Sequence, residues 1–244
     1  MWSECGHRYK LVYKDKIPFY SSNEYTAFGS AIHETCEKAI FGNEKTDPND
    51  FFLKSFKENR KEIEKPNEKL ASEMLPQGEK ILESVPDAVD EFFGKRGVDY
   101  EVASLEEQLF VPIRPDLSFK GYIDMVLMTP DGKYHIIDWK TCTWGWNFRK
   151  KSDKLITYQL TLYKKYFCEK HDIDPKNVET YFALLKRTAK KDNVEIFRVT
   201  SGHKKTENAL KSLDAFIYNC NKSVYFKNRL SCKYCNFYKT EHCR

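Results

Sequence analysis

Three charged residues, Asp124, Asp138 and Lys140, lie in a segment (residues 121–141) that otherwise has the composition of a buried β-hairpin. Aspartate is depleted in strands, and a charge that faces the core costs free energy unless something pairs with it. Residues two apart on a strand share a face, so Asp138 and Lys140 project together, and a short turn brings Asp124 close to Asp138. Two neighbouring carboxylates repel, and a divalent cation between them removes that penalty.

The chemistry available to such a group is metal-assisted attack on a phosphodiester. Carboxylate oxygens and water are the ligands that Mg²⁺ and Mn²⁺ prefer, and a lysine beside them can hold a water or a phosphate oxygen. The spacing Asp-x-Lys alone is not specific, because it also occurs at 131–133 and 174–176. The hairpin by itself therefore fits a cation site and a lone ion pair at a strand end about equally well.

Two helical residue pairs are candidates to complete a site. Gly29 and His33 are four residues apart on an early helix, and Gln159 and Tyr163 have the same spacing on the helix that follows the hairpin. Residues four apart share one helix face. Taken alone, a helical histidine is more often structural or solvated, and a Gln–Tyr pair is more often on the surface.

The order of the predicted elements indicates an α/β or α+β core. Periodicity and capping signals predict a helix that ends at Gly42, helices over 50–95 interrupted by Pro66, Pro76 and Pro86, and further helices over 152–171 and 204–222. Alternating patterns predict strands over 100–113, 119–128, 133–140, 178–187 and 193–200. The segment HRYKLVY has mixed spacing and fits the start of either a helix or a strand.

Composition and charge bound the class of protein. With 244 residues, 41% of them hydrophobic, the chain can bury a large core, and no apolar run reaches the length of a membrane span. The N-terminus lacks the apolar core of a signal peptide, so we expect a cytoplasmic protein with no membrane partner. The C-terminal half is basic and the N-terminal half acidic, which suggests a nucleic-acid partner or a solubilising face. Basic residues that follow the hairpin are candidates to track a phosphate backbone: Arg149, Lys150, Lys151 and Lys154.

The eight cysteines fall into two groups. Cys36, Cys142, Cys168 and Cys220 lie among apolar neighbours and are expected to be small core residues. The other four are Cys5, alone near the N-terminus, and a C-terminal cluster of Cys232, Cys235 and Cys243. That distribution predicts a metal site, whose fourth ligand is either Cys5 or His242.

Four motifs occur in a fixed order: GSAIH, GYID, IIDWK and QLTLY. In this combination the sequence resembles the RecB-like branch of the PD-(D/E)xK nucleases. The resemblance implies a single domain over 1–244 with a restriction-endonuclease-like core, a mixed central sheet flanked by helices and a helical insertion over 43–98. It further implies that the metal is held by His33, Asp124, Asp138 and the backbone carbonyl of Trp139.

The remaining motif residues receive roles through the same resemblance. Lys140 would position the attacking water and stabilise developing negative charge, while Gln159 and Tyr163 would hold the site and the nucleic-acid backbone. Glu107, on the strand before Gly121, matches a less constant acidic position of the family and would be an additional metal ligand.

The cysteines also have a counterpart in this family. Its iron–sulfur members, such as the CRISPR-associated RecB-like nucleases and the AddB-type helicase–nucleases, use one cysteine before the core and three after it. By resemblance, Cys5, Cys232, Cys235 and Cys243 would hold a [4Fe–4S] cluster, with residues 223–244 closing on Cys5. Two departures bear on the metal's identity: Gly6 replaces the usual proline after the first cysteine, and seven residues separate Cys235 from Cys243. Zinc is the alternative.

Together these features predict a Mg²⁺- or Mn²⁺-dependent DNA nuclease, specifically an exonuclease that prefers single strands and acts in recombination, repair or replication. Because the sequence contains no helicase-type phosphate loop, any unwinding must come from a partner, for which a helicase or recombination protein is the candidate. Two alternatives stay open: a catalytically silent nucleic-acid-binding or assembly module of the same fold, and a nuclease for RNA or branched DNA. The intact Asp124, Asp138 and Lys140 count against a silent module. No residue selects an oligomeric state.

Overall fold

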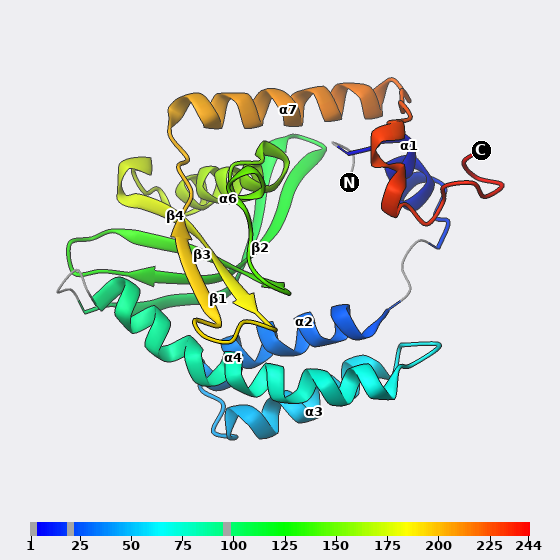
Figure 1. Ribbon diagram of the computed structural model, residues 1–244. Coiled ribbons are helices and arrows are strands. Elements are labelled where there is room, and N and C mark those ends of the chain that lie inside the picture. Colours follow the sequence, from blue (N-terminus) through cyan, green and yellow to red (C-terminus); the bar gives the residue numbers. More distant parts are fainter. Residues whose placement is uncertain (1–3, 19–21, 95–98) are drawn as a thin grey trace. The chain divides into compact units, whose positions relative to one another are not determined.

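The computed structural model describes residues 4–18, 22–94 and 99–244, which form two compact units. The larger unit is Ser22–Gly202, and the smaller combines Met1–Ser21 with His203–Arg244. Figure 1 shows the elements of both units. Among the described residues, no helix is long and apolar enough to cross a membrane.

The larger unit is built on one five-stranded mixed sheet of order β1-β2-β3-β4-β5. Its strands are β1 (Glu101–Arg114), β2 (Leu117–Met128), β3 (Tyr134–Cys142), β4 (Val178–Lys186) and β5 (Val194–Arg198). All neighbours are antiparallel except β3 and β4. A parallel pair needs a long crossover, and α5 (Phe148–Lys151) and α6 (Lys154–His171) supply it. The predicted α/β core with a mixed sheet flanked by helices is therefore confirmed.

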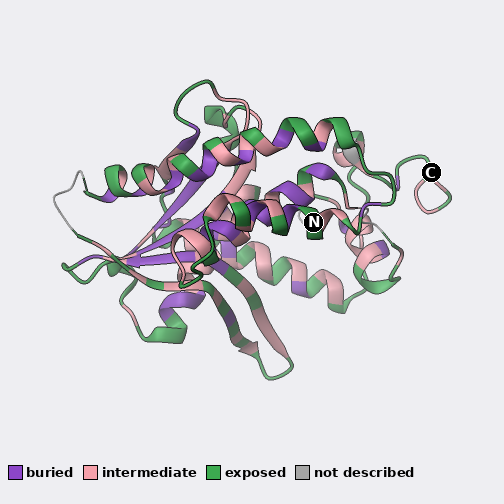
Figure 2. Cartoon of the chain, turned by 90° about the horizontal axis from the view of Figure 1, so that it is seen from below, coloured by how far each residue is buried: buried purple, intermediate pink, exposed green. Residues whose placement is uncertain are grey.

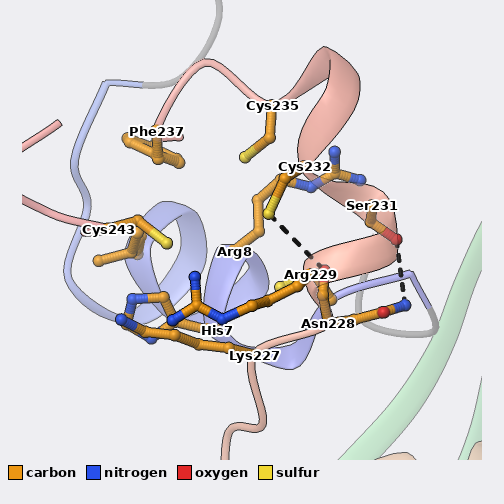
Figure 3. A pocket seen from close by; sticks show the side chains of 12 residues that line it. His7, Arg8, Lys227, Asn228, Arg229, Ser231, Cys232, Cys235, Phe237 and Cys243 are labelled. Carbon is orange, nitrogen blue, oxygen red and sulfur yellow. Dashed lines mark hydrogen bonds between the residues drawn. The ribbon is translucent and has the colours of Figure 1, made fainter. Parts of the chain in front are cut away.

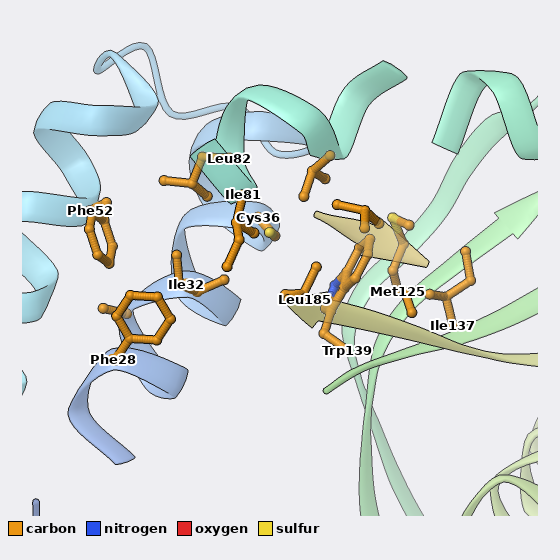
Figure 4. Close-up of a cluster of buried hydrophobic side chains, with 14 of the residues drawn as sticks. Phe28, Ile32, Cys36, Phe52, Ile81, Leu82, Met125, Ile137, Trp139 and Leu185 are labelled. Atoms are coloured by element: carbon orange, nitrogen blue, oxygen red, sulfur yellow. The ribbon is translucent and has the colours of Figure 1, made fainter. Parts of the chain in front are cut away.

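Helices cover both faces of the sheet. α6 lies on one face, and α2 (Glu24–Thr35), α3 (Pro48–Arg60) and α4 (Glu68–Gly94) lie on the other (Figure 1). The main core fills the space between these three helices and the sheet, and Phe28, Phe52 and Trp139 are part of it (Figure 4). Phe28 packs against Phe52, and Trp139 stacks with Phe41. Figure 2 shows the result: the strands through the centre are mostly buried, and the outer helix surfaces are exposed.

The expected breaks at two prolines are wrong, because α4 runs as one helix of 27 residues through Pro76 and Pro86. A proline inside a helix removes a hydrogen bond and costs about 3 kcal/mol. α4 tolerates this cost because eight of its residues are buried, and each large apolar side chain buried contributes roughly 1.5–3 kcal/mol. Gly78 allows the close approach of α3, since a Cβ there would lie 2.4 Å from the Phe52 ring.

The helix predicted to end at Gly42 changes type partway along. α2 ends at Thr35, and the chain continues as a π-helical turn, Cys36–Ile40. The backbone at Gly42 packs tightly against this turn: a Cβ there would lie 2.5 Å from the carbonyl oxygen of Glu37, so the position requires glycine. Single π-helical turns within helices are frequent at functional sites.

The smaller unit joins the two ends of the chain. The segment HRYKLVY is helical: α1 (Gly6–Tyr9) is followed by a π-helical turn, Lys10–Lys14. α7 (His203–Asn221) and a 3₁₀ helix (Arg229–Tyr234) come from the C-terminal part. The carbonyl of Glu4 accepts hydrogen bonds from the side chains of Asn228 and Ser231, each 2.8 Å long. The N- and C-terminal segments are therefore bonded to each other directly.

Candidate active site

α2 brings His33 to the sheet. The helix starts in a capping box, in which the side chain of Asn23 accepts from the N–H of Thr26 while the Thr26 hydroxyl accepts from the N–H of Asn23. One turn before His33 is Gly29, where a Cβ would lie 3.1 Å from the Thr141 hydroxyl oxygen. The glycine of the motif Gly-x-x-x-His thus lets α2 approach the end of β3, directly after Lys140.

β2 and β3 separate at the point where their two aspartates face each other. Their paired register ends at Met125 and Ile137, so Asp124 and Asp138 are the next residues on each strand. The backbone N–H of Trp139 donates instead to Oδ2 of Asp124 at 2.7 Å. The Asp124 carboxylate therefore pairs with the Trp139 N–H where the two strands separate, and this hydrogen bond fixes its position.

A backbone irregularity in β1 lies beside Asp124. Glu106 has a φ of +46°, a left-handed conformation that is uncommon for a residue other than glycine. Its neighbours Leu105 and Glu107 pair with Met125 and Ile123, which places Glu106 opposite Asp124. Strained backbone of this kind is often found at functional sites.

The irregularity exchanges the two faces of the β1–β2 hairpin. Leu105 and Met125 pack with the core beneath α2 and α4. Two residues further along β1, Glu107 instead contacts Lys170 and His171 of α6. Residues two apart on a regular strand share a face. Beyond Glu106, the side of the hairpin that carries Glu107 therefore faces α6. The opposite side, which carries Glu106 and Asp124, faces α2.

Three side chains near Asp124 and the end of α2 converge, and their ligand atoms are of the kinds that bind metal ions. One ligand atom each from His33, Glu37 and Asp124 lies within 4.8 Å of the others, and Nδ1 of His33 is 3.7 Å from Oδ2 of Asp124. Glu37 was missed by sequence analysis, although it follows His33 by four residues and so shares its helix face. Two carboxylates and an imidazole suit a divalent cation such as Mn²⁺ or Mg²⁺.

Asp138 and Lys140 form the adjoining half of the site. Nζ of Lys140 lies 2.5 Å from Oδ2 of Asp138, and Asp138 is almost fully buried. The Lys140 ammonium is the partner of Oδ2 of Asp138 in this ion pair. A buried carboxylate next to the three converging ligands is a further oxygen donor that suits a divalent cation.

α6 adds the two residues of the QLTLY motif. Nε2 of Gln159 donates to the hydroxyl of Tyr163 at 3.0 Å. A Cβ at Gly121 would lie 2.8 Å from the Tyr163 ring, so the glycine of GYID is required for the ring to sit against β2. Two close contacts therefore bring the four motifs together. Gly29 of α2 packs against the end of β3, and Tyr163 of α6 packs against Gly121 of β2.

The site is electrostatically strained without a cation. Burial raises the pKa of Asp124 and of Asp138 to about 6, although Lys140 partly offsets it in both cases. Burial, followed by the charge of Glu106, raises the pKa of Glu37 to about 9. Burial lowers the pKa of His33 to about 4, which keeps its imidazole neutral and able to act as a ligand.

Lys140 stays protonated in this setting. Burial alone would lower its pKa, but the Asp138 and Asp124 carboxylates outweigh burial and raise it. Its ammonium is therefore a donor and a positive charge, and it is not a base at neutral pH.

Some of the expected residues lie elsewhere or are engaged differently. The carboxylate of Glu107 is bound to Lys170 and His171 and is outside the group of three ligands. Lys151 is paired with Glu195, whereas Arg149, Lys150 and Lys154 are exposed. The ammonium of Lys150 lies 4.6 Å from the Trp146 ring centre.

The four cysteines predicted to bind metal line one pocket of the smaller unit. Cys5, Cys232, Cys235 and Cys243 share it with basic residues, namely His7, Arg8, Lys227 and Arg229. Figure 3 shows the sulfur atoms of Cys232, Cys235 and Cys243 directed into this space. Cys36 and Cys168 are buried, and Cys142 and Cys220 are partly buried.

Comparison with known proteins assigns this arrangement to a class. The family model of the PD-(D/E)XK nuclease superfamily matches residues 2–240, and the chain belongs to this superfamily. No curated protein sequence matches the chain.

Two solved structures are similar to the chain. One is a protein from Eubacterium rectale, described as a proposed exonuclease. It has a TM-score of 0.58 and 15% sequence identity, and the match covers 95% of this chain and 79% of that one. The other, SSO0001, has a TM-score of 0.38 and 12% identity over 95% of this chain and 91% of that one. The first likeness shows the fold, and the second is too weak to support an argument.

Proposed function

We propose that this superfamily member is a divalent-metal-dependent DNA nuclease, and specifically an exonuclease that acts on single-stranded ends. The observation that carries the proposal is the convergence of His33, Glu37 and Asp124 within 4.8 Å, beside the ion pair of buried Asp138 with partly buried Lys140. The proposed metal ligands are His33, Glu37, Asp124 and Asp138, together with the backbone carbonyl of Trp139 predicted from the motif. When bound, Mg²⁺ or Mn²⁺ supplies Lewis-acid polarisation of a phosphate oxygen and lowers the pKa of water.

The chain's own residues have distinct roles in this proposal. The Lys140 ammonium, held protonated by two carboxylates, neutralises charge that develops on the phosphate. Tyr163 also stays protonated because burial raises its pKa. Since Gln159 donates to the Tyr163 oxygen, the hydroxyl proton is left to donate to a phosphate oxygen of the substrate. The exposed Arg149, Lys150 and Lys154 are proposed to contact the backbone further along the strand.

Digestion of single-stranded DNA blocked at one end or the other tests the proposal. In Mg²⁺ or Mn²⁺ we expect loss of nucleotides from one end only, and no loss in EDTA. Release of internal fragments would make the enzyme an endonuclease. Faster digestion of RNA or of branched duplexes would change the substrate class.

A matched pair of variants distinguishes the site from general surface effects. Asp138→Ala should abolish cleavage and leave DNA binding largely intact. Asp131→Ala is its control, because Asp131 is also two residues before a lysine and lies 2.8 Å from Lys133, but in an exposed turn. Binding without cleavage by the wild-type protein in any metal would instead favour a catalytically silent module.

We also propose that the cysteine pocket holds a [4Fe–4S] cluster. Four thiols line it, which matches the ligand count of such a cluster, and basic side chains around it offset the negative charge of four thiolates. The cluster would tie Cys5 to the C-terminal segment.

Iron and sulfide content after anaerobic purification tests this assignment. About four iron and four sulfide per chain, lost together in Cys235→Ser, would support the cluster. One zinc per chain without iron would support the alternative, and no metal of either kind would refute both.

A further inference from the structure

The β1–β2 hairpin has one covered face and one open face beyond Glu106. On the covered face, Phe119 stacks against Tyr166 with ring centres 4.2 Å apart, and Gly121 lies beneath the Tyr163 ring. Lys120 and Tyr122, the residues that follow Phe119 and Gly121, therefore point away from α6. Figure 2 shows that exposed residues recur along the strands in this part of the molecule.

The open face carries two aromatic rings in solvent. Phe110 is 65% exposed and Tyr122 is 46% exposed. Phe110 pairs across the strands with Lys120, and Tyr122 pairs with Gln108, so the rings are diagonal neighbours on adjacent pairs. Large aromatic side chains on a sheet face usually pack against another layer, and exposing two of them has a cost that an occupant removes.

The chemistry of this face fits nucleic acid. The ammonium of Lys120 lies 5.6 Å from the Tyr122 ring centre. On the same face, positions 108, 110 and 112 of β1 and 118, 120 and 122 of β2 contain no acidic residue. Flat rings with a lysine beside both of them are the elements of a base-stacking surface.

The open face is also continuous with the metal site. Tyr122 is two residues from Asp124, about 7 Å along the strand, and Lys120 is four residues away, about 14 Å. Alternation places both on the side of the hairpin that carries Asp124 and Glu106. A strand whose phosphate lies at Asp124 can therefore continue directly onto the rings.

We propose that Phe110, Lys120 and Tyr122 form a stacking platform for the bases of single-stranded nucleic acid next to the cleaved phosphate. The rings bind bases without regard to sequence, and Lys120, which neighbours both rings, contacts the phosphate backbone. The position of the platform relative to the cleaved phosphate rests on the proposed nuclease function. It has no part in the chemical step.

The test is the affinity for a fluorescent oligothymidylate, measured in EDTA so that no cleavage occurs. Phe110→Ser and Tyr122→Ser should each weaken binding about tenfold, and the double variant about a hundredfold. Tyr122→Trp should retain the affinity, and added DNA should quench its fluorescence more than that of the wild type, which has four tryptophans of its own. Lys120→Gln should reduce the slope of log affinity against log salt by about 0.7, whereas the ring variants leave that slope unchanged.

Tyr218→Ser is the matched control, since Tyr218 is an equally exposed aromatic (64%) on α7 in the smaller unit. Binding by the Phe110/Tyr122 double variant at wild-type affinity would refute the platform, as would a change in oligomeric state with DNA affinity unchanged. The two proposals fail separately. If the wild type cuts nothing but needs the rings to bind DNA, only the nuclease function is lost; if it cuts and the double variant binds normally, only the platform is lost.

Discussion

Replacing Asp138 with asparagine should stabilise the metal-free protein while removing its activity. Burial raises the pKa of this carboxyl from 3.8 to about 6 in the folded chain. Each pKa unit corresponds to about 1.4 kcal/mol, so keeping Asp138 ionised at pH 8 costs the folded state up to about 3 kcal/mol. The asparagine side chain carries no charge, so the variant avoids this cost.

The sign of the effect depends on pH. Because the folded-state pKa lies above the unfolded value, the folded chain binds more protons between about pH 4 and 6, and its stability falls as the pH rises through that window. Below pH 4 Asp138 is protonated in both states, and the advantage of Asp138→Asn disappears. For a chain of this size, about 3 kcal/mol corresponds to a rise in Tm of roughly 6–12 °C.

Thermal unfolding in EDTA at pH 8 and at pH 4 measures this difference. Asp131→Asn is a control of opposite sign, because hydrogen bonds from Lys133 and Thr129 lower the pKa of Asp131 to about 2, and neutralising it should not stabilise the protein. Added Mn²⁺ should raise the Tm of the wild type more than that of Asp138→Asn. Equal destabilisation by Asp138→Asn at both pH values would refute the view that this site is strained without a cation.

Three further predictions concern the surroundings of the metal ligands. Glu37→Gln should weaken Mn²⁺ binding about tenfold or more in calorimetry, because it removes one of three converging ligands; unchanged affinity would exclude Glu37 from the site. Gly121→Ala should reduce cleavage strongly with little change in circular dichroism, because a Cβ there would displace the Tyr163 ring, and wild-type activity would show that the ring's position does not matter. Glu106→Gln should reduce metal affinity more than Glu107→Gln, because the charge of Glu106 acts on Asp124. Glu107→Gln should chiefly lower Tm, because it releases the contact with Lys170 of α6. A larger loss of metal affinity in Glu107→Gln would instead support Glu107 as a ligand.

The fold could be predicted from the sequence because its signals are local. Alternation gave the five strands, and the i, i+4 pairs of α2 and α6 gave the faces that carry His33 and Tyr163. The two motif glycines, Gly29 and Gly121, are needed where a helix approaches a strand closely, which is why they mark the site so well.

What sequence analysis missed depends on tertiary structure. The continuity of α4 through Pro86 follows from burial against the sheet, which local propensity does not contain. The left-handed backbone at Glu106, which local patterns do not predict, accompanies a change of face on β1, so that Glu107 contacts Lys170 and His171 of α6. Glu37 had a signal in its spacing from His33, but an acidic residue four positions along a helix usually faces solvent.

The measurement that tests the central claim most directly compares two lysines in the same assay. Cleavage of end-labelled single-stranded DNA in Mn²⁺ is followed for Lys140→Ala and Lys133→Ala, each the lysine of an Asp-x-Lys sequence, with Mn²⁺ binding measured in parallel. We expect Lys140→Ala to lose cleavage by at least about a hundredfold while it still binds Mn²⁺, and Lys133→Ala to behave as the wild type. Normal cleavage by Lys140→Ala would contradict the assignment of this site to phosphodiester hydrolysis.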